Sequence, residues 1–311
     1  MNFTLLLAGT LSALGLLHPC AATATDANRN GIDEAVEEAL LSRYAPVVIL
    51  APGERALPAN VDWYLARVRL DPPGPADEGA PGDRPELRVT QASLLGDVEL
   101  AVRAVGRRMM RLRPNLAARP GSADPRDWIV YGHVYAGEDG GLLVQYWFFY
   151  PFNDFHVLFD HEGDWEHVTV RLDARLKPLG AWYARHAWSA PGRWFEWGDL
   201  EHEGEHPVVL SARGSHASYG EAADVLWWDR TCDTRVPGEA RRFGCKVWRT
   251  GDSATGGIVN TGRRDRPRPR AGFVSWPGEW GTEGWFGRET GGPPGPAYQA
   301  GWCSEGSASC S

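Results

Sequence analysis

One short run of the chain, His161–His167, concentrates acidic and imidazole side chains at the start of an expected β-strand. Side chains alternate along a strand, so Asp164 and Glu166 share one face, about 7 Å apart along the chain. Two carboxylates held this close repel each other unless a proton or a cation lies between them. A divalent metal ion is the simplest neutraliser, and His161 on the preceding turn adds an imidazole. The alternative is a solvated surface pair, but the apolar residues of the adjoining strands favour a site.

A second candidate metal site lies near the start of the chain. Asp26, Asn28 and Asn30 alternate before Gly31, and Glu37 occupies the twelfth position counted from Asp26. Oxygen ligands at these positions around a turn-forming glycine are typical of a calcium loop. The alternative is a polar segment that caps a helix, and the residues alone leave both interpretations open.

Two catalytic motifs fail because of their surroundings. His202-Glu203-Gly204-Glu205-His206 matches a zinc-protease pattern that works only on a helix, and its central glycine and the following Pro207 disfavour a helix there. Gly214-Ser215-His216 lacks the Gly-x-Ser-x-Gly elbow of many serine hydrolases. Neither zinc-protease nor serine-hydrolase chemistry is therefore expected.

The composition limits the classes of function. The 311-residue chain has a formal net charge of −8, which argues against nucleic-acid binding. Its 15 tryptophans suggest a large aromatic core, a surface that binds glycans or lipid headgroups, or both. Trp182, Trp188 and Trp194 are the candidates for stacking on a ligand, and packing in the core is the alternative for each of them.

The first 24 residues resemble an export signal. They contain an apolar run over residues 5–17 and end in the small residues Ala22-Thr23-Ala24, and the run is short for a membrane span. We therefore expect a secreted or periplasmic protein. Removal of the signal leaves four cysteines, for which the disulfides Cys232–Cys245 and Cys303–Cys310 are the simplest pairing and a zinc site is the rival.

The elements that must position these residues are mainly strands. A helix is expected over 33–42, helical character over 94–112, a Pro- and Gly-rich insert near 71–86 and an irregular C-terminal wrap from about 273. The spacing predicts one antiparallel β-sandwich domain over residues 25–311, with peripheral short helices and long irregular loops. Strands are expected over 44–50, 128–135, 142–152, 164–172, 180–187, 207–212 and 246–250, the second and third being joined by a hairpin turn at 137–141.

Several blocks spread over most of the chain carry a family resemblance. They are Tyr44-Ala45-Pro46-Val47-Val48 with Glu54, Pro58 and Trp63, then Tyr146-Trp147-Phe148-Phe149-Tyr150-Pro151, His161–His167, Pro207-Val208-Val209, Gly214-Ser215-His216-Ala217-Ser218-Tyr219, and Gly278-Glu279-Trp280-Gly281 with Gly292-Pro293. In this order they resemble the vacuolar protein sorting-associated protein 62 family. The name of that family reflects a trafficking role and implies no particular chemistry.

The block around Asp164 also resembles, more distantly, the necrosis-inducing, cytolysin-like secreted proteins. In those β-sandwich proteins the first His, the Asp and the Glu of a similar motif line a cavity for a divalent metal. This chain departs from the motif at Gly163, where the second His is missing, and its spacer before His161 is shorter. The resemblance implies a metal site drawn from Asn153 or Asp154 together with His161, Asp164, Glu166 and His216.

These candidate ligands indicate a cation and a class of function. Oxygen ligands with few imidazoles favour Ca²⁺ or Mg²⁺ over zinc, and His216 is either a ligand or a hydrogen-bond donor to one. The expected protein is an exported, cation-dependent binder of glycans or lipid headgroups that contacts membranes peripherally. The alternatives are a metal-dependent hydrolase of phosphoesters or polysaccharides, with His161 or His216 as general base, and a trafficking-related or structural protein with a structural cation.

Overall fold

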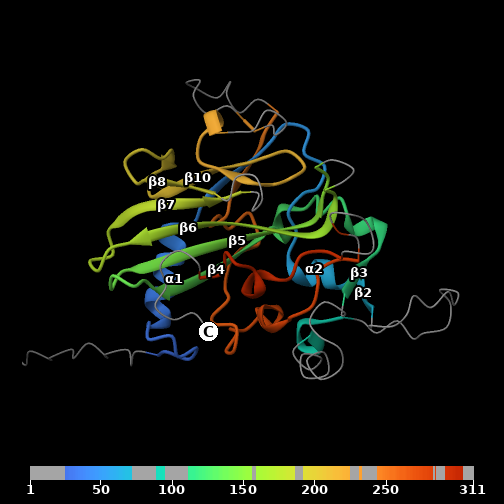
Figure 1. The fold of residues 1–311 in the computed structure, drawn as a ribbon, viewed down its shortest axis with the longest axis horizontal. Helices are drawn as coiled ribbons and strands as arrows, with labels where there is room; N and C mark the ends of the chain where they lie inside the picture. The colour runs from blue at the N-terminus through green and yellow to red at the C-terminus, as the bar shows by residue number, and fades with distance from the viewer. Residues whose placement is uncertain are drawn as a thin grey trace, which may run out of the picture.

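The computed structural model describes residues 25–71, 89–94, 111–155, 159–185, 192–224, 231–232, 244–282, 284 and 291–303. The chain is mainly β, as the sequence predicts, and its two larger sheets pack face to face (Figure 1). The expected signal, nearly all of the insert near 71–86 and most of the helix expected over 94–112 lie outside the described residues. Residues 111–112, at the end of that expected helix, belong to a strand instead.

The larger sheet has six strands in the order β13-β4-β5-β6-β7-β8. The structure confirms the hairpin between β4 and β5 and the strands β6 and β7, which the alternating and apolar residues predict. The short strands β8 and β13 are not expected from the sequence. The bounds are β4 Ile129–Ala136, β5 Leu142–Asn153, β6 His161–Leu172, β7 Pro178–Ala184, β8 Gly192–Glu196 and β13 Gly257–Asn260.

The second sheet has the order β11-β10-β1-β12, with β9 paired to β10. Its β1–β10 pair is parallel, as is β13–β4 in the larger sheet, and the other strand pairs of the two sheets are antiparallel. Both parallel pairs join segments far apart in the chain, so no hairpin sets their direction. The bounds are β1 Val47–Leu50, β9 His202–Glu203, β10 His206–Ser211, β11 Ser218–Tyr219 and β12 Lys246–Arg249.

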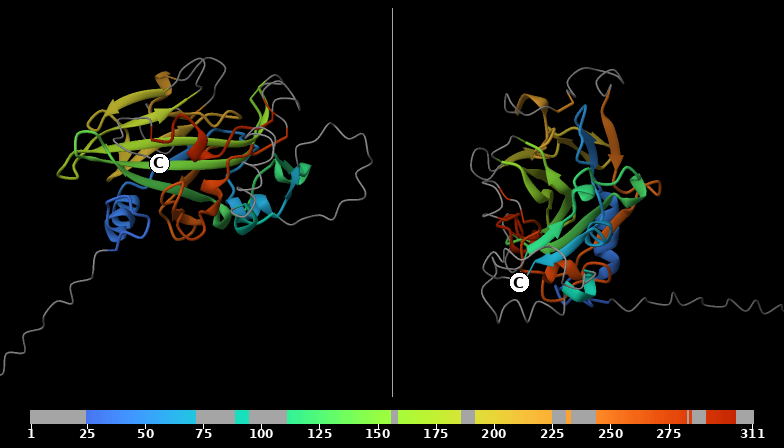
Figure 2. Two further views of the ribbon diagram at one scale, coloured as in Figure 1. Left: turned by 60° about the horizontal axis from the view of Figure 1, so that its bottom comes forward. Right: turned by 90° about the vertical axis from the view of Figure 1, so that its right-hand side faces the viewer.

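The main core lies between the two sheets. Val48, Val209 and Trp248 of the smaller sheet pack in one cluster with Phe148 and Val170 of the larger sheet. Helix α1 (Glu34–Arg43), which confirms the expected first helix, closes this core at one end with Leu40 and Leu41. Figure 2 shows α1 at one end of the larger sheet and helix α2 (Val61–Leu65) near the other end.

A second core covers the outer face of the larger sheet. Trp147 and Trp165 pack there against α2 and against the late residues Phe273 and Trp280. These late residues form part of an irregular segment with two short 3₁₀ helices, which lies over the sheet in orange and red in Figure 1. The remaining described elements are β2 Val68–Asp71, β3 Arg111–Pro114, η2 Leu116–Ala118, η3 Pro125–Asp127, η4 Ala222–Asp224, η6 Gly272–Ser275 and η7 Pro296–Tyr298.

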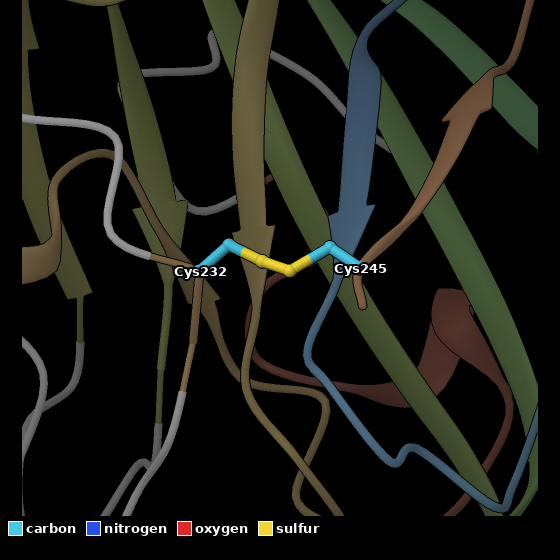
Figure 3. The surroundings of a disulfide bond; sticks show 2 residues. All are labelled: Cys232 and Cys245. Carbon is cyan, nitrogen blue, oxygen red and sulfur yellow. A yellow bond between two sulfur atoms is a disulfide. The ribbon is translucent and has the colours of Figure 1, made fainter. Parts of the chain in front are cut away.

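A disulfide ties the end of the second sheet together. Cys232 and Cys245 are bonded across a sequence separation of 13 residues, which confirms the first predicted pair (Figure 3). The bond joins the residue just before β12 to the segment after β11. Cys310 lies outside the described residues, so the pair Cys303–Cys310 stays a prediction. Within the described ranges, no helix is long and apolar enough to cross a membrane.

Candidate functional site

A glycine places the predicted imidazole beside the predicted carboxylate. Val168 and Val170 of β6 face the core between the sheets, and Asp164 lies on the same side by alternation. Gly163 then adopts a φ of +77° and reverses the alternation. Glu162 consequently points to the outer face, where it pairs with Arg119, and His161 joins Asp164 on the inner side.

Asp164 is the centre of the site. Its residue surface is 4% exposed, and the two oxygens of its carboxylate contact different imidazoles. The Oδ1 atom lies 3.2 Å from Nε2 of His161, and the Oδ2 atom lies 2.7 Å from Nδ1 of His216. The structure therefore brings together three of the predicted site residues from two segments about 50 residues apart.

His216 is a buried cation. Its Nδ1 faces Asp164, and its Nε2 lies 3.2 Å from the Ala56 carbonyl oxygen and 3.7 Å from Oε1 of Glu54. All three neighbours are acceptors, so both ring nitrogens must carry protons. Burial alone would lower the pKa of His216, but the charge of Glu54 and the hydrogen bond to Asp164 raise it to about 10. The ring of Tyr150 stacks on the imidazolium at 3.8 Å.

Glu54, which accompanies the first block of the family resemblance, is a member of this site that no periodic pattern identifies. It follows β1 in a turn, and its side chain is 2% exposed. The backbone N–H of Ala56 donates to Oε1 at 2.8 Å and that of Gly214 donates to Oε2 at 2.7 Å. Burial alone would raise the pKa of Glu54, but the charge of His216 and these hydrogen bonds lower it to about 2. The charge of His216 thus lies between two carboxylates.

The pH dependence of stability follows from these groups. Burial alone would raise the pKa of Asp164, but its contacts with His161 and His216 lower it from 3.8 to about 2, so its contribution, like that of Glu54, is lost as the pH falls toward 2. Burial lowers the pKa of His133 from 6.5 to about 3, which also removes stability as the pH falls below 6.5. His216 acts in the opposite sense, because its stabilising charge is lost as the pH rises from 6.5 through 10.

We expect the free energy of unfolding to be highest near pH 6.5 and to fall toward pH 10. Urea unfolding at a series of pH values measures this curve. A free energy of unfolding that stays constant from pH 6.5 to pH 10 would contradict the buried imidazolium.

The contact between His161 and Asp164 has a particular requirement. Nδ1 of His161 lies 3.0 Å from the carbonyl oxygen of Phe159, so Nδ1 carries a proton and donates it. In the neutral ring Nε2 then has a lone pair, which faces the negative Oδ1 of Asp164. The contact is favourable only if a second proton or a cation lies at this edge of the ring. A backbone carbonyl that fixes the tautomer in this way is common behind metal-binding histidines.

Asn153 supplies a further oxygen at the same end of the sheet. It is 6% exposed and pairs across the β5–β6 ladder with His161. Its Nδ2 donates to the carbonyl oxygen of Ser215 at 3.3 Å, whereas its buried Oδ1 has no hydrogen-bond partner. An acceptor buried without a donor is costly, and a cation would satisfy it. The carboxylate and amide oxygens are the ligand types that Ca²⁺ and Mg²⁺ prefer, whereas an imidazole nitrogen is less usual for these two ions.

Two other predicted residues are less buried than Asp164. Asp154 is exposed, and its backbone N–H donates to the Gly214 carbonyl oxygen, so the buried Asn153 is the better candidate of the two. Glu166 is half-buried on the Asp164 side of β6. Among the described residues, no three His, Cys, Asp or Glu side chains are arranged to hold a metal ion by themselves.

The stacking candidates lie apart from this site. Trp182 and Trp194 are half-buried and directly opposite each other on β7 and β8. Ala181 and Tyr183, on either side of Trp182, face the core between the sheets, so the two tryptophans lie on the outer face, away from Asp164. Trp188 lies outside the described residues. The structure therefore does not bring these tryptophans and the candidate metal ligands together.

A family comparison covers the strands that build the site. Residues 130–245 match the family model described as vacuolar protein sorting-associated protein 62. The match runs from β4 to the residue before β12 and includes Asp164 and His216, but it does not reach Glu54. The resemblance seen in the sequence blocks is therefore confirmed over this stretch. A search among curated proteins finds no match.

A comparison with solved structures matches proteins whose descriptions include a toxin fold and a necrosis-inducing protein. One is described as NLPPya in complex with glucosamine, at 15% identity and a TM-score of 0.37, covering 76% of this chain and 77% of that one. Another is Necrosis and Ethylene inducing Protein 2 from the causal agent of cocoa's Witches Broom disease, at 13% identity and a TM-score of 0.34, covering 75% and 76%. They are the group that the sequence resembles more distantly. A likeness of this size carries no information about ligand or activity.

Proposed function

We propose that this protein is an exported binder of glycans or lipid headgroups that acts through a divalent cation, Ca²⁺ or Mg²⁺, at the end of β5 and β6. The observation that carries this proposal is the facing pair of His161 Nε2 and Asp164 Oδ1, together with the unsatisfied Oδ1 of Asn153, the residue that pairs with His161 across the β5–β6 ladder. A cation bound by these three atoms would use its remaining positions for ligand oxygens, such as the hydroxyls of a sugar or the oxygens of a headgroup.

The hydrogen bonds favour recognition over hydrolysis. A metal-dependent hydrolase needs a general base that can take a proton from water. Both nitrogens of His216 already face buried acceptors, and Nδ1 of His161 faces a carbonyl oxygen. His216 therefore has no lone pair with which to act as base, and the one lone pair of His161, on Nε2, would be taken up by the proposed cation. A binding site needs no base.

The disulfide between Cys232 and Cys245 supports the proposal that the protein is exported. The Cys232–Cys245 bond is of the kind that persists in secreted and periplasmic proteins and is rare in a reducing cytosol. An exported protein also meets the ligands proposed here, which lie on cell surfaces. Release of the mature chain into the medium or periplasm, with a new N-terminus near residue 25, is the direct test of this part.

Binding to a glycan array and to phospholipid vesicles, each with and without EDTA, tests the proposed function. We expect chelation to weaken binding at least about tenfold. Glu166→Gln removes one carboxylate at the half-buried rim of the site and should weaken binding in the same direction, whereas Glu38→Gln, on the exposed face of α1, should not. The array and the vesicles distinguish a free glycan from a lipid headgroup. Binding that EDTA leaves unchanged would refute the proposal.

A further inference from the structure

The N-terminal loop over residues 26–37 has the local structure of a calcium loop as well as its spacing. Gly31, at the sixth position, adopts a φ of +86°, which permits the sharp turn that such loops need. Helix α1 begins at Glu34, within the loop, so that Glu37 at the twelfth position lies in its first turn. A helix therefore follows the loop, as one follows a calcium loop, and the side chain of Asp33 caps this helix by accepting from the backbone N–H of Ala35.

Two carboxylates are buried under this loop. Glu34 is 6% exposed and Glu37 is 1% exposed. Oε1 of Glu34 accepts from the backbone N–H of Asn28 and contacts the guanidinium of Arg268 at 3.3 Å. Its Oε2 is buried and has no hydrogen-bond partner. Because Oε1 of the same carboxylate bonds to the loop backbone, the oxygen without a hydrogen-bond partner lies beside the loop, where a cation would satisfy it.

The hydrogen-bond donors that contact the carboxylate of Glu37 are all side-chain amides. The Nδ2 atoms of Asn28, Asn30 and Asn260 donate to its oxygens, at 3.1, 2.5 and 2.7 Å for the shortest contact of each. Three neutral donors compensate a buried negative charge less well than a cation does. No ion pair to Glu37 occurs among the described residues, so the buried charge of this glutamate is not balanced by a cationic side chain there.

Asn28 is able to turn its oxygen toward the buried carboxylates. Its Oδ1 now accepts from the backbone N–H of Asn30 at 3.0 Å, but that N–H also has Oδ1 of Asp26 at 3.0 Å. A half-turn of the Asn28 amide exchanges its nitrogen and oxygen and brings Nδ2 against the N–H of Asn30, which keeps Asp26 as acceptor, so the turn is favourable only when an ion holds the oxygen. Oδ1 would then face Glu37 and bind the same ion.

Asn30 has a different role from the one its position suggests. Its Nδ2 donates to the carbonyl oxygen of Val134 on β4, and its Oδ1 accepts from the backbone N–H of Ile32. Both ends of its amide are therefore committed, and Asn30 anchors the loop to the larger sheet. Asn260, which contacts Glu37, extends this anchor to β13.

We propose that this loop is a second metal site, which binds Ca²⁺ through Asp26, Asn28, Glu34 and Glu37 and thereby fastens α1 to the edge of the larger sheet. In this structure the acidic side chains do not converge as a ready-made cage. Closure of the loop on the ion requires the half-turn of Asn28 and satisfies the free oxygen of Glu34. The site is independent of the one at Asp164.

Calcium titration by isothermal calorimetry on the purified full chain tests the site. Glu37→Gln keeps the shape of the buried residue and Asp26→Asn changes only an exposed one, so the second variant remains informative if the first does not fold. Glu38→Gln is the matched control, because it removes a neighbouring carboxylate from the exposed face of the same helix.

We expect Glu37→Gln and Asp26→Asn to weaken one calcium-binding event at least about tenfold, and Glu38→Gln and Glu166→Gln to leave it unchanged. The melting temperature should rise with calcium in the control variant and should rise less in Asp26→Asn. Calcium binding that is equal in Asp26→Asn and Glu38→Gln would overturn the proposal. So would a single binding event that Glu166→Gln alone removes, because it would place the ion at Asp164.

Discussion

Replacement of Asp164 by Asn should lower the free energy of unfolding by about 3–5 kcal/mol, because it removes one member of a buried, hydrogen-bonded charge group. Asn has nearly the shape of Asp, so the packing stays intact and the electrostatic loss is isolated. The imidazolium of His216 would keep Glu54 at 3.7 Å but would lose its contact of 2.7 Å to a carboxylate oxygen. Urea unfolding near pH 6.5, where the wild-type group is most stable, measures the loss.

Two further measurements separate this explanation from a general weakening of the fold. Nuclear magnetic resonance titration of the His216 ring should show a pKa below that of the wild-type protein, which a loss of packing elsewhere would not produce. Glu205→Gln, which breaks an exposed pair with Arg43, should change stability little. If Asp164→Asn and Glu205→Gln have equal effects, the buried charge group does not stabilise the protein as inferred.

The strands around the site could be predicted from the sequence because their signals are local. The alternation after Asp164 and the glycine-rich turn between β4 and β5 identify the central hairpins without further information. The short strands β8 and β13 lack this advantage, since each has only four or five residues and acquires its place by pairing with a longer strand. Tertiary pairing, rather than propensity, determines such elements.

The residues of the site could be predicted only in part, because some of them meet through tertiary contacts. Alternation identifies the side of the strand on which Asp164 lies. The expectation that two close carboxylates need a positive charge between them also applies, but to a different second carboxylate and a different charge. The structure pairs Asp164 with Glu54 rather than with Glu166 around His216, and the imidazolium provides the charge. Glu54 lies in a turn more than 100 residues away in sequence, where no periodic pattern indicates its partner.

The outer tryptophans illustrate a different limit. Trp182 and Trp194 are candidates for stacking on a ligand because tryptophan suits the faces of sugars. A side chain on a two-sided strand can face either sheet surface, and a single residue of shift exchanges them. The pairing of Val168 with Tyr183 decides the question, since it turns Tyr183 to the core and Trp182 outward.

Replacement of Gly163 by Ala should destabilise the protein by about 2–5 kcal/mol and should also displace His161 from Asp164. The φ of +77° is costly for any side chain, and an added Cβ would lie 2.4 Å from both Cβ and the backbone oxygen of Trp280. Trp280 is fully buried against Trp165 and Phe149, so the backbone beneath it has little room to retreat. The reversal of alternation that brings His161 inward depends on this one residue.

Gly140→Ala is the matched control for this substitution. Gly140 has a φ of +78°, almost the same as that of Gly163, but nothing lies within 4 Å of an added Cβ. The control therefore measures the backbone cost alone, about 1–2 kcal/mol, and the excess in Gly163→Ala measures the contact with Trp280. Urea unfolding gives both values, and loss of EDTA-sensitive binding in Gly163→Ala alone would link the turn to the site. Equal destabilisation by the two substitutions would show that Trp280 can move away from the added Cβ. In that case the contact with Trp280 does not hold Gly163 in its left-handed conformation.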